Sequence, residues 1–393
     1  MVRLQFSRLV CLSISLCGAS MAVPLNTRDT GAVPAGVPDF VVKHAPLVYL
    51  HSQEKYMPSD MAAQLAHTVP KFNLDSLPAN VTLPTLTLAN LDILNQYGNA
   101  GSDMFLTSVD DITTNPAWLT GVTPNAAGVC ENAKTGTIIV ADKGNGITDA
   151  FYLSFYAYNW GGITLGQELG DHVGDWEHTM VRFVNGEPAY MYFSQHAGGQ
   201  AFTWNAVQKD SSGLRPLSFS ANGSHATYAI DGIHDHTIPG PVHRNEPGII
   251  NDYTDYGLLY DLTQSAYYYS WTPPASQKSK RVDVSIPPSA EELAAIPFGK
   301  SVPEGDLFKR DIDPSTTAPG TFTPYDTTSP VNYVYFKGHW GDQQYAKTDP
   351  RQKNFLNLFW KYEGGPTGPA WKDINRQNVF PGTTGVIYDT LMP

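Results

Sequence analysis

Cysteine, charge and long apolar runs are all scarce in this chain of 393 residues, and each scarcity argues against a class of protein. Cys11 and Cys17 lie in the first 22 residues, so Cys130 alone remains for the rest of the chain. One cysteine cannot form an internal disulfide, so a packed core must stabilise the fold. Charged residues make up 16% of the chain, with 25 basic and 37 acidic residues. Without a cluster of Lys and Arg to follow a phosphate backbone, nucleic acid is not an expected partner.

Apolar runs are short as well, and none reaches the roughly 18 residues that a membrane-spanning helix requires. The N-terminal run, Leu9 to Leu16, follows two arginines and precedes the small residues Ser20-Met21-Ala22. This pattern predicts a secretory signal peptide over residues 1–22. We therefore expect a protein that is secreted or delivered to a vacuolar lumen and that contacts membrane only peripherally.

Aromatic residues make up 12% of the chain, and glycine and proline are frequent, whereas helical periodicity is rare. Short β-rich segments alternate with turn clusters, which predicts an all-β fold with minor helices, an antiparallel β-sandwich or jelly roll. The predicted strands are residues 136–142, 149–160, 178–184, 189–195, 266–271 and 331–338. Asn185-Gly186 predicts a hairpin turn between two of them. Helices are predicted at residues 58–68, capped by Ser59 or Asp60, and at residues 289–296.

The predicted mature chain has a short tail, residues 23–38, followed by a single β domain, residues 39–393. Residues 272–330 are rich in Pro, Ser and Lys and are expected to form a loop-rich excursion. The dibasic pairs Lys280-Arg281 and Lys309-Arg310 within it are possible processing sites. Asn80 and Asn222 begin N-glycosylation sequons, of which Asn80 is the better acceptor because Asn222 lies among suspected site residues.

The stretch "GDHVGDWEHTMVRF", residues 170–183, gathers metal-binding side chains next to an apolar strand. If the strand starts at Trp176, alternation places Asp175 and Glu177 on one face and His178 on the other. His172 joins from the preceding glycine-rich turn. One imidazole and two carboxylates suit Mg²⁺, Ca²⁺ or Mn²⁺, with Zn²⁺ as a further option. A hydrogen-bonded turn without a metal explains the same spacing equally well.

Other polar clusters can join this site. "SQHAGG" places His196 before two glycines, and residues 219–236 contain Ser224, His225, His234, Asp235 and His236. A triad of Ser224, Asp235 and either His225 or His196 is conceivable, but no G-x-S-x-G elbow supports it. Asp252 and Asp255, together with His339, Trp340 and Asp342, offer a second carboxylate cluster or a surface that stacks on sugars. Turn chemistry accounts for Asp252 and Asp255 equally well.

Several of these segments resemble one family along nearly the whole mature chain. They are "APLVYLHSQEKYMPS" (45–59), "YLSFYAYNWG" (152–161), "HVGDWEHTMVRF" (172–183), "SQHAGG" (194–199), "SANGSHATYA" (220–229) and "GHWGDQQY" (338–345). The sequence resembles fungal and plant vacuolar protein sorting-associated proteins of the sixty-two type. That family is associated with delivery of proteins to the vacuole, while its biochemical activity is largely undefined. The resemblance therefore implies a pathway more than a reaction.

A more distant resemblance concerns the motif itself. "DHVGDWEH" is similar to the "GHRHDWEH" region of necrosis- and ethylene-inducing-peptide-like cytolysins, secreted β-sandwich proteins that hold a divalent cation and bind sphingolipid head-group sugars. The likeness implies that His172, Asp175 and Glu177 bind the cation and that His196 lies beside it. Asp171 is one candidate for the remaining acidic ligand, together with Glu168 and Asn159. The cysteine pair of the cytolysins is absent, so membrane damage is not implied.

Three functions follow from these residues. In the first, the cation presents open positions to a glycan or glycolipid head group, with His196, His225 and Asp342 at the ligand. Stacking aromatics are then Trp160, Trp204 and Trp340. In the second, Glu177 is the general acid or base of a metal-assisted hydrolase, partnered by His178 or His196. In the third, the ion only ties a loop to the sheet. We expect the binding protein first and the hydrolase second.

Overall fold

The computed structural model describes residues 33–235 except 197, residues 250–274, and residues 320–391 except 356, 358, 383 and 384. These residues belong to one compact unit, Ala32–Pro393. The predicted signal peptide, the predicted helix at 289–296, His236, both dibasic pairs and most of the 272–330 excursion lie outside the described residues. None of the helices in the described ranges has the length and apolar character needed to span a bilayer.

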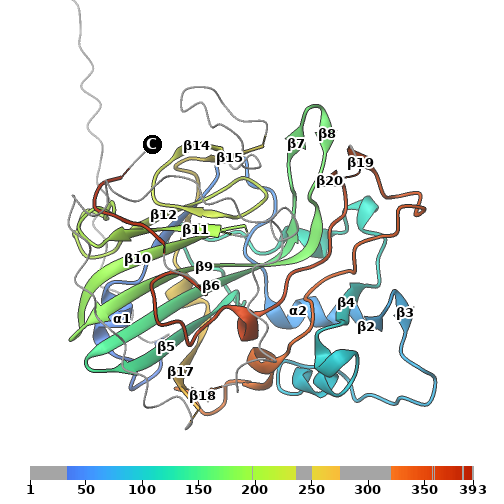
Figure 1. The fold of residues 1–393 in the computed structure, drawn as a ribbon, viewed down its shortest axis with the longest axis horizontal. Helices are drawn as coiled ribbons and strands as arrows, with labels where there is room; N and C mark the ends of the chain where they lie inside the picture. The colour runs from blue at the N-terminus through green and yellow to red at the C-terminus, as the bar shows by residue number, and fades with distance from the viewer. Residues whose placement is uncertain are drawn as a thin grey trace, which may run out of the picture. The chain divides into compact units, whose positions relative to one another are not determined.

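The largest sheet has eight strands, and Figure 1 shows β10, β9, β6, β5 and β17 following one another across it. In spatial order the strands are β18 (Thr321–Pro324), β17 (Ala266–Thr272), β5 (Gly136–Gly144), β6 (Ile147–Asn159), β9 (His172–Val184), β10 (Glu187–Gln195), β11 (Gly198–Thr203) and β21 (Ile387–Tyr388). Most neighbours run antiparallel, whereas β17–β5 and β11–β21 are parallel. Positive φ values at Asn185 (54°) and Gly186 (84°) confirm the predicted hairpin between β9 and β10.

A second sheet of four strands makes the described unit a β-sandwich. Its strands are, in spatial order, β13 (Thr227–Tyr228), β12 (Leu217–Ser220), β1 (Leu47–Leu50) and β16 (Leu259–Tyr260). Val48 and Leu50 of β1 share a buried cluster with Val181, Phe183 and other side chains of the large sheet. Each such side chain contributes about 1.5–3 kcal/mol when it leaves water. The all-β prediction is therefore confirmed.

The opposite face of the large sheet is buried too. Met104, Leu106, Phe336 and Trp340 come from segments on either side of the main strands in sequence and pack with Trp176 in a second core cluster. With both faces covered, β6 is buried at nearly every position and does not alternate. This explains why its sequence, "ITDAFYLSFYAYN", is almost continuously apolar and aromatic.

The remaining elements are short. The helices are α1 (Asp39–Lys43) and α2 (Met61–Ala66), with 3₁₀ helices at Leu91–Gln96, Asn99–Gly101, Ile112–Thr114, Ala117–Thr120, Leu262–Gln264, Asn332–Tyr335 and Pro369–Trp371. The small sheets are β3 (Asp75–Ser76), β2 (Thr68–Phe72) and β4 (Met104–Ser108), then β7 (Ile163–Thr164) with β8 (Gln167–Glu168), β14 (Gly232–Asp235) with β15 (Asn251–Thr254), and β19 (Asn354–Phe355) with β20 (Phe359–Trp360). Asp60 caps α2 by accepting from Ala63 N at 2.8 Å, as one of the two predicted caps.

The strand predicted at residues 331–338 is wrong, because the chain forms the 3₁₀ helix Asn332–Tyr335 there. Tyr333 and Val334 are both fully buried in the same core cluster. A strand would point two consecutive side chains to opposite faces. A tight helical turn brings both into one core, and Phe336 follows them after the turn.

Candidate functional site

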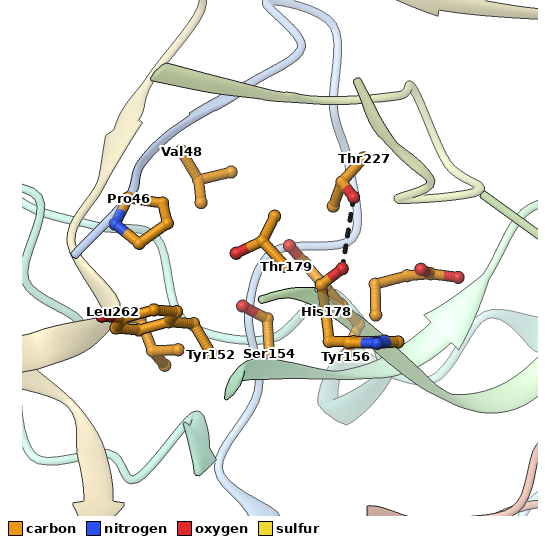
Figure 2. Close-up of a pocket in the computed structure, with 10 residues that line it drawn as sticks. Pro46, Val48, Tyr152, Ser154, Tyr156, His178, Thr179, Thr227 and Leu262 are labelled. Carbon is orange, nitrogen blue, oxygen red and sulfur yellow. Dashed lines mark hydrogen bonds between the residues drawn. The ribbon is translucent and has the colours of Figure 1, made fainter. Parts of the chain in front are cut away.

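Strand β9 presents its motif to both sides of the large sheet. Glu177, His178 and Thr179 line a small cavity between the two sheets. Thr227 of β13 also lines it, and its hydroxyl donates to the main-chain carbonyl oxygen of His178 at 3.4 Å (Figure 2). Trp176 and Met180 lie in the core on the opposite side. The predicted alternation of this strand is therefore confirmed. The cavity has room for about one water molecule.

Asp175 is anchored by a buried histidine. His225 Nδ1 lies 2.9 Å from Asp175 Oδ2, and His225 Nε2 lies 3.0 Å from the carbonyl oxygen of Tyr56. Glu54 Oε1 is 3.7 Å from the same Nε2. Burial lowers the pKa of His225, but the charge of Glu54 and the hydrogen bond to Asp175 outweigh it and raise the pKa to about 10. Both ring nitrogens therefore donate, and His225 is an imidazolium with no exposed surface.

Glu177 and Asp171 are the two acidic side chains of the motif that have a buried oxygen without a hydrogen-bond partner. Glu177 is only 8% exposed, and its Oε2 has no hydrogen-bond partner. Burial raises its pKa, the neighbouring charge of Asp175 raises it further, and Lys372 and His196 oppose the shift, leaving the pKa at about 8. Without another cation, Glu177 thus holds a proton at neutral pH.

His172 has the hydrogen bonding of a metal-binding imidazole. Its Nδ1 lies 2.7 Å from the carbonyl oxygen of Gly174, so Nδ1 donates and Nε2 carries the lone pair. Burial lowers the pKa of His172, with the charge of Asp175 acting against it. The ring is therefore neutral at neutral pH. Gly174 adopts a left-handed φ of 70° inside β9, between His172 and Asp175.

His196 stands at the turn between β10 and β11 and is held by a buried carboxylate. Its Nε2 lies 2.7 Å from Asp252 Oδ2, and its side chain is 35% exposed. The hydroxyls of Ser224 and Tyr228 each donate to Asp252 at 2.7 Å. This geometry contradicts the conceivable triad, because Ser224 bonds the carboxylate and not a histidine. The carboxylate at His196 belongs to Asp252, and Asp235 lies in strand β14.

Two of the predicted site residues lie elsewhere. Asp171 Oδ1 accepts from Gly161 N at 2.9 Å, its Oδ2 is 3.5 Å from Lys361 Nζ, and burial raises its pKa to about 6. Asp171 therefore belongs with Gly161 and Lys361 and not with the side chains around Glu177. His178 is on the opposite face of β9, where Arg376 Nη2 donates to its Nε2 at 3.2 Å. It therefore cannot partner Glu177.

Three of the predicted ligand contacts are structural or distant. Trp340 is fully buried in the core and offers no surface to a sugar. Asp342 is buried and accepts from Ser108 N and the Tyr345 hydroxyl. Trp204 directly follows the last residue of β11, which pairs with Tyr190, whereas His196 lies just before the first residue of β11. At about 3.3 Å per residue, six paired positions separate them by roughly 20 Å.

Trp160 is the predicted aromatic that stays near the site. Its backbone N donates to Gly223 O at 2.9 Å, and its indole N donates to Glu168 at 2.9 Å. A side chain at Gly223 would overlap its indole ring, so Trp160 packs directly over the loop that carries Ser224 and His225.

The two predicted glycosylation sequons differ in their surroundings. The hydroxyl of Ser224, the third residue of the Asn222 sequon, donates to Asp252, whereas Asn80 is exposed.

The candidate ligands for a cation are not assembled into a site. Among the described residues, no three His, Cys, Asp or Glu side chains converge closely enough to hold a metal ion. Glu177 Oε2, the Asp175 carboxylate and the Nε2 lone pair of His172 are atoms of the kinds that hard divalent cations take as ligands. Binding requires these side chains to rotate toward one another.

Glu54 is the site residue that sequence reasoning missed. It lies more than 100 residues before β9, and no spacing connects it with the motif. The available signal was its place in "HSQEKY", inside one of the segments that carried the family resemblance. Asp252 was noted as a possible carboxylate, but its pairing with His196 depends on the fold.

Comparison with known proteins identifies the family of this chain. A family model described as vacuolar protein sorting-associated protein 62 matches residues 139–270. The putative vacuolar protein sorting-associated protein TDA6 of Saccharomyces cerevisiae is 34% identical over 377 residues, 89% of this chain and 69% of the relative. This chain belongs to the vacuolar protein sorting-associated protein 62 family. Vacuolar protein sorting-associated protein 62 of the same yeast is 33% identical over 367 residues, 87% of this chain and 67% of the relative. The family-model match spans β5 to β17 and includes the motif of β9.

Two solved structures are also similar to this family member. Necrosis and Ethylene inducing Protein 2, from the causal agent of cocoa's Witches Broom disease, is 13% identical with a TM-score of 0.24, covering 50% of this chain and 70% of its own. The non-toxic HaNLP3 protein is 14% identical with a TM-score of 0.25, covering 61% and 78%. Likenesses of this size establish neither an ion nor a ligand for this chain.

Proposed function

We propose that this protein binds a divalent cation through His172, Asp175 and Glu177, and that the cation binds a glycan or glycolipid head group. The observation that carries the proposal is the buried Oε2 of Glu177, which has no hydrogen-bond partner beside a second carboxylate. An unpaired polar atom in such a place costs about 1–3 kcal/mol. A cation removes this cost and the repulsion between the two carboxylates.

The ligand set favours a cation with open positions. Three side chains supply one nitrogen and two or more oxygens, so Mg²⁺, Ca²⁺ or Mn²⁺ would keep places for water or sugar hydroxyls, with Zn²⁺ as the further option. His225 fixes one oxygen of Asp175 and so limits how far that carboxylate turns. Trp160 supplies a half-buried aromatic face near the same loop.

The predicted passage of the protein through the secretory pathway also supports this proposal. Membership of the family supports a role connected with vacuolar protein sorting. A signal peptide would deliver the protein to the secretory pathway, from where it reaches a vacuolar lumen or leaves the cell. Glycans and glycolipid head groups are exposed on the lumenal side of these compartments.

A metal-assisted hydrolase is the second candidate, favoured by one observation. A carboxyl group whose pKa is about 8 can donate a proton at neutral pH, as a general acid must. The geometry leaves Glu177 without His178 as its partner, because that ring lies across the sheet. The substrate would be a glycan or an ester.

The test is binding of the purified protein to an immobilised oligosaccharide panel and to glycolipid vesicles, with calcium and with chelator. We expect saturable binding that weakens roughly tenfold or more with chelator and in Glu177→Gln. The exposed Glu187 on β10 gives the control Glu187→Gln, which should bind normally. Binding that ignores both chelator and Glu177→Gln contradicts the proposal. Product released from the panel by the wild type but not by Glu177→Gln assigns the hydrolase instead.

A further inference from the structure

The β7–β8 hairpin carries two exposed aliphatic side chains at its tip. Ile163 is 68% exposed and Leu165 is 63% exposed, the two highest values among the large apolar side chains of the described ranges. Leu165 and Gly166 form the two-residue turn between the strands. A Cβ at Gly162 or Gly166 would have no neighbour within 4 Å, and Figure 1 shows the hairpin projecting from the rest of the fold.

Leu165 adopts a backbone conformation that leucine disfavours. Its φ is 50°, and the φ of Gly166 is 75°. Two positive φ values define a turn that usually contains Asn-Gly, because the Cβ of leucine crowds the backbone in the left-handed region. Asparagine would fit this exposed turn with less strain. The hairpin therefore keeps an apolar side chain in solvent at a conformational cost, which points to a contact outside the molecule.

The outer part of the hairpin also has no charge. Among residues 161–170, all of which the structure describes, Glu168 is the only charged side chain. The Trp160 indole nitrogen donates to Glu168 Oε1 at 2.9 Å, and Lys361 Nζ donates to Glu168 Oε2. The part of the hairpin beyond this pair is therefore uncharged, although the formal charge of the chain is −12.

Trp160 lies at the base of the hairpin, at a distance from the tip that suits a bilayer surface. Tryptophan side chains concentrate at the level of the lipid head groups. Leu165 lies five residues further along the chain, roughly 15 Å at about 3.3 Å per residue. The head-group layer is only about 5–8 Å thick. With the half-buried Trp160 at head-group level, the Leu165 side chain therefore reaches the hydrocarbon.

A second hairpin, β14–β15, adds an apolar pair. Ile233 is 61% exposed and Tyr253 is 48% exposed, and they share one face because they lie directly opposite each other in the two strands. Tyr253 O accepts from Asn222 N at 2.9 Å, and Gly223 O accepts from Trp160 N at 2.9 Å. These two consecutive residues thus connect β15 with the base of the first hairpin.

We propose that the tip of the β7–β8 hairpin inserts into the surface of a lipid bilayer with zwitterionic head groups, with β14–β15 as the second contact. A stable protein complex buries about 800 Å² on each partner, and a hairpin with two residues in each strand is too narrow to supply that area. Anionic lipids repel an acidic chain, so zwitterionic head groups are favoured. This inference goes beyond the proposed function and requires neither a cation nor a glycan.

The experiment measures how the full chain partitions onto sedimented phosphatidylcholine vesicles in chelator. The wild type should bind saturably, and phosphatidylserine added to the vesicles should weaken binding. Leu165→Asn should bind roughly tenfold more weakly, because it removes one aliphatic side chain from the hydrocarbon. Asparagine accepts the positive φ, so the melting temperature should stay unchanged or rise. Ile163→Thr added to Leu165→Asn should weaken binding further.

Leu74→Asn is the matched control. Leu74 is also an exposed leucine with a positive φ, 43% exposed at 66°, in the turn between β2 and β3. This turn lies next to the charged residues Lys71 and Asp75, whereas the tip of β7–β8 is uncharged. Leu74→Asn should therefore bind vesicles as the wild type does.

Four results would overturn the inference. They are wild-type protein that stays in solution with the vesicles, binding that persists in the double variant, an equal loss in Leu74→Asn, and binding that phosphatidylserine strengthens. Dimerisation that depends on Leu165, without vesicle binding, assigns the hairpin to a second copy of this chain instead. The vesicles contain no sugar and the immobilised oligosaccharides contain no lipid, so failure of this inference and failure of the proposed function are separate results.

Discussion

At the scale of single residues, the site depends on which carboxylate oxygens have donors. Asp175 and Asp252 are each paired with an imidazole, whereas one oxygen of Glu177 has no partner. The unpaired oxygen lies beside another carboxylate in a buried setting, so its ionisation costs free energy. Glu177 is accordingly the residue at which a proton would compete with the proposed metal ion.

Glu177 should make the cation-free protein less stable as the pH rises. Its pKa is about 8 in the folded state against 4.5 ordinarily, so its contribution is fully present below pH 4.5 and is lost as pH rises through 8. We expect the free energy of unfolding in chelator to fall by about 1–4 kcal/mol between pH 6 and 9, and Glu177→Gln to flatten this fall. Urea unfolding at the two pH values measures it. An equal fall in the wild type and in Glu177→Gln would show that another group titrates.

At the scale of elements, β9 contains a glycine with a left-handed conformation where its motif begins. Gly174 has a φ of 70°, and a Cβ there would come within 2.2 Å of the Trp340 carbonyl oxygen. Only glycine combines this conformation with so close a neighbour. His172 and Asp175 lie on either side of this glycine in β9.

Gly174→Ala should therefore destabilise the protein and weaken binding at the proposed cation site. We expect a loss of about 3 kcal/mol or more, since the methyl group forces the backbone or Trp340 to move. Gly166→Ala is the control, because Gly166 has a similar φ of 75° with nothing within 4 Å of its Cβ, and should cost about 1 kcal/mol. Chemical denaturation and calcium titration measure both effects. Equal losses in Gly166→Ala and Gly174→Ala would refute the steric role of Gly174.

Features of the fold and site that depend on neighbouring residues could be predicted from the sequence, whereas contacts between distant residues could not. The Asn185-Gly186 turn, the Asp60 cap and the two faces of β9 follow from local rules, and the structure confirms them. The 3₁₀ helix at residues 332–335 does not follow from local rules, because it forms to bury side chains in a core that distant segments complete. The bonds of His225 to Asp175 and of His196 to Asp252 join residues 50 and 56 positions apart, which spacing alone does not reveal.

At the scale of the whole described unit, the sandwich brings three parts of the chain to one place. Strand β9 supplies the motif, the loop before β13 supplies His225, and the N-terminal segment after β1 supplies Glu54. Both faces of the large sheet are covered, so side chains at its middle positions serve the core. The polar site lies where β9, β10 and the loop before β13 meet.

The central claim is a divalent cation at His172, Asp175 and Glu177, and metal analysis of the purified protein tests it most directly. Wild-type protein dialysed against calcium, magnesium, manganese and zinc should retain about one divalent ion per chain. The retained ion should be lost in Glu177→Gln and kept in the control Glu187→Gln. Wild-type protein that retains no ion, or Glu177→Gln that retains as much as the wild type, would contradict the account.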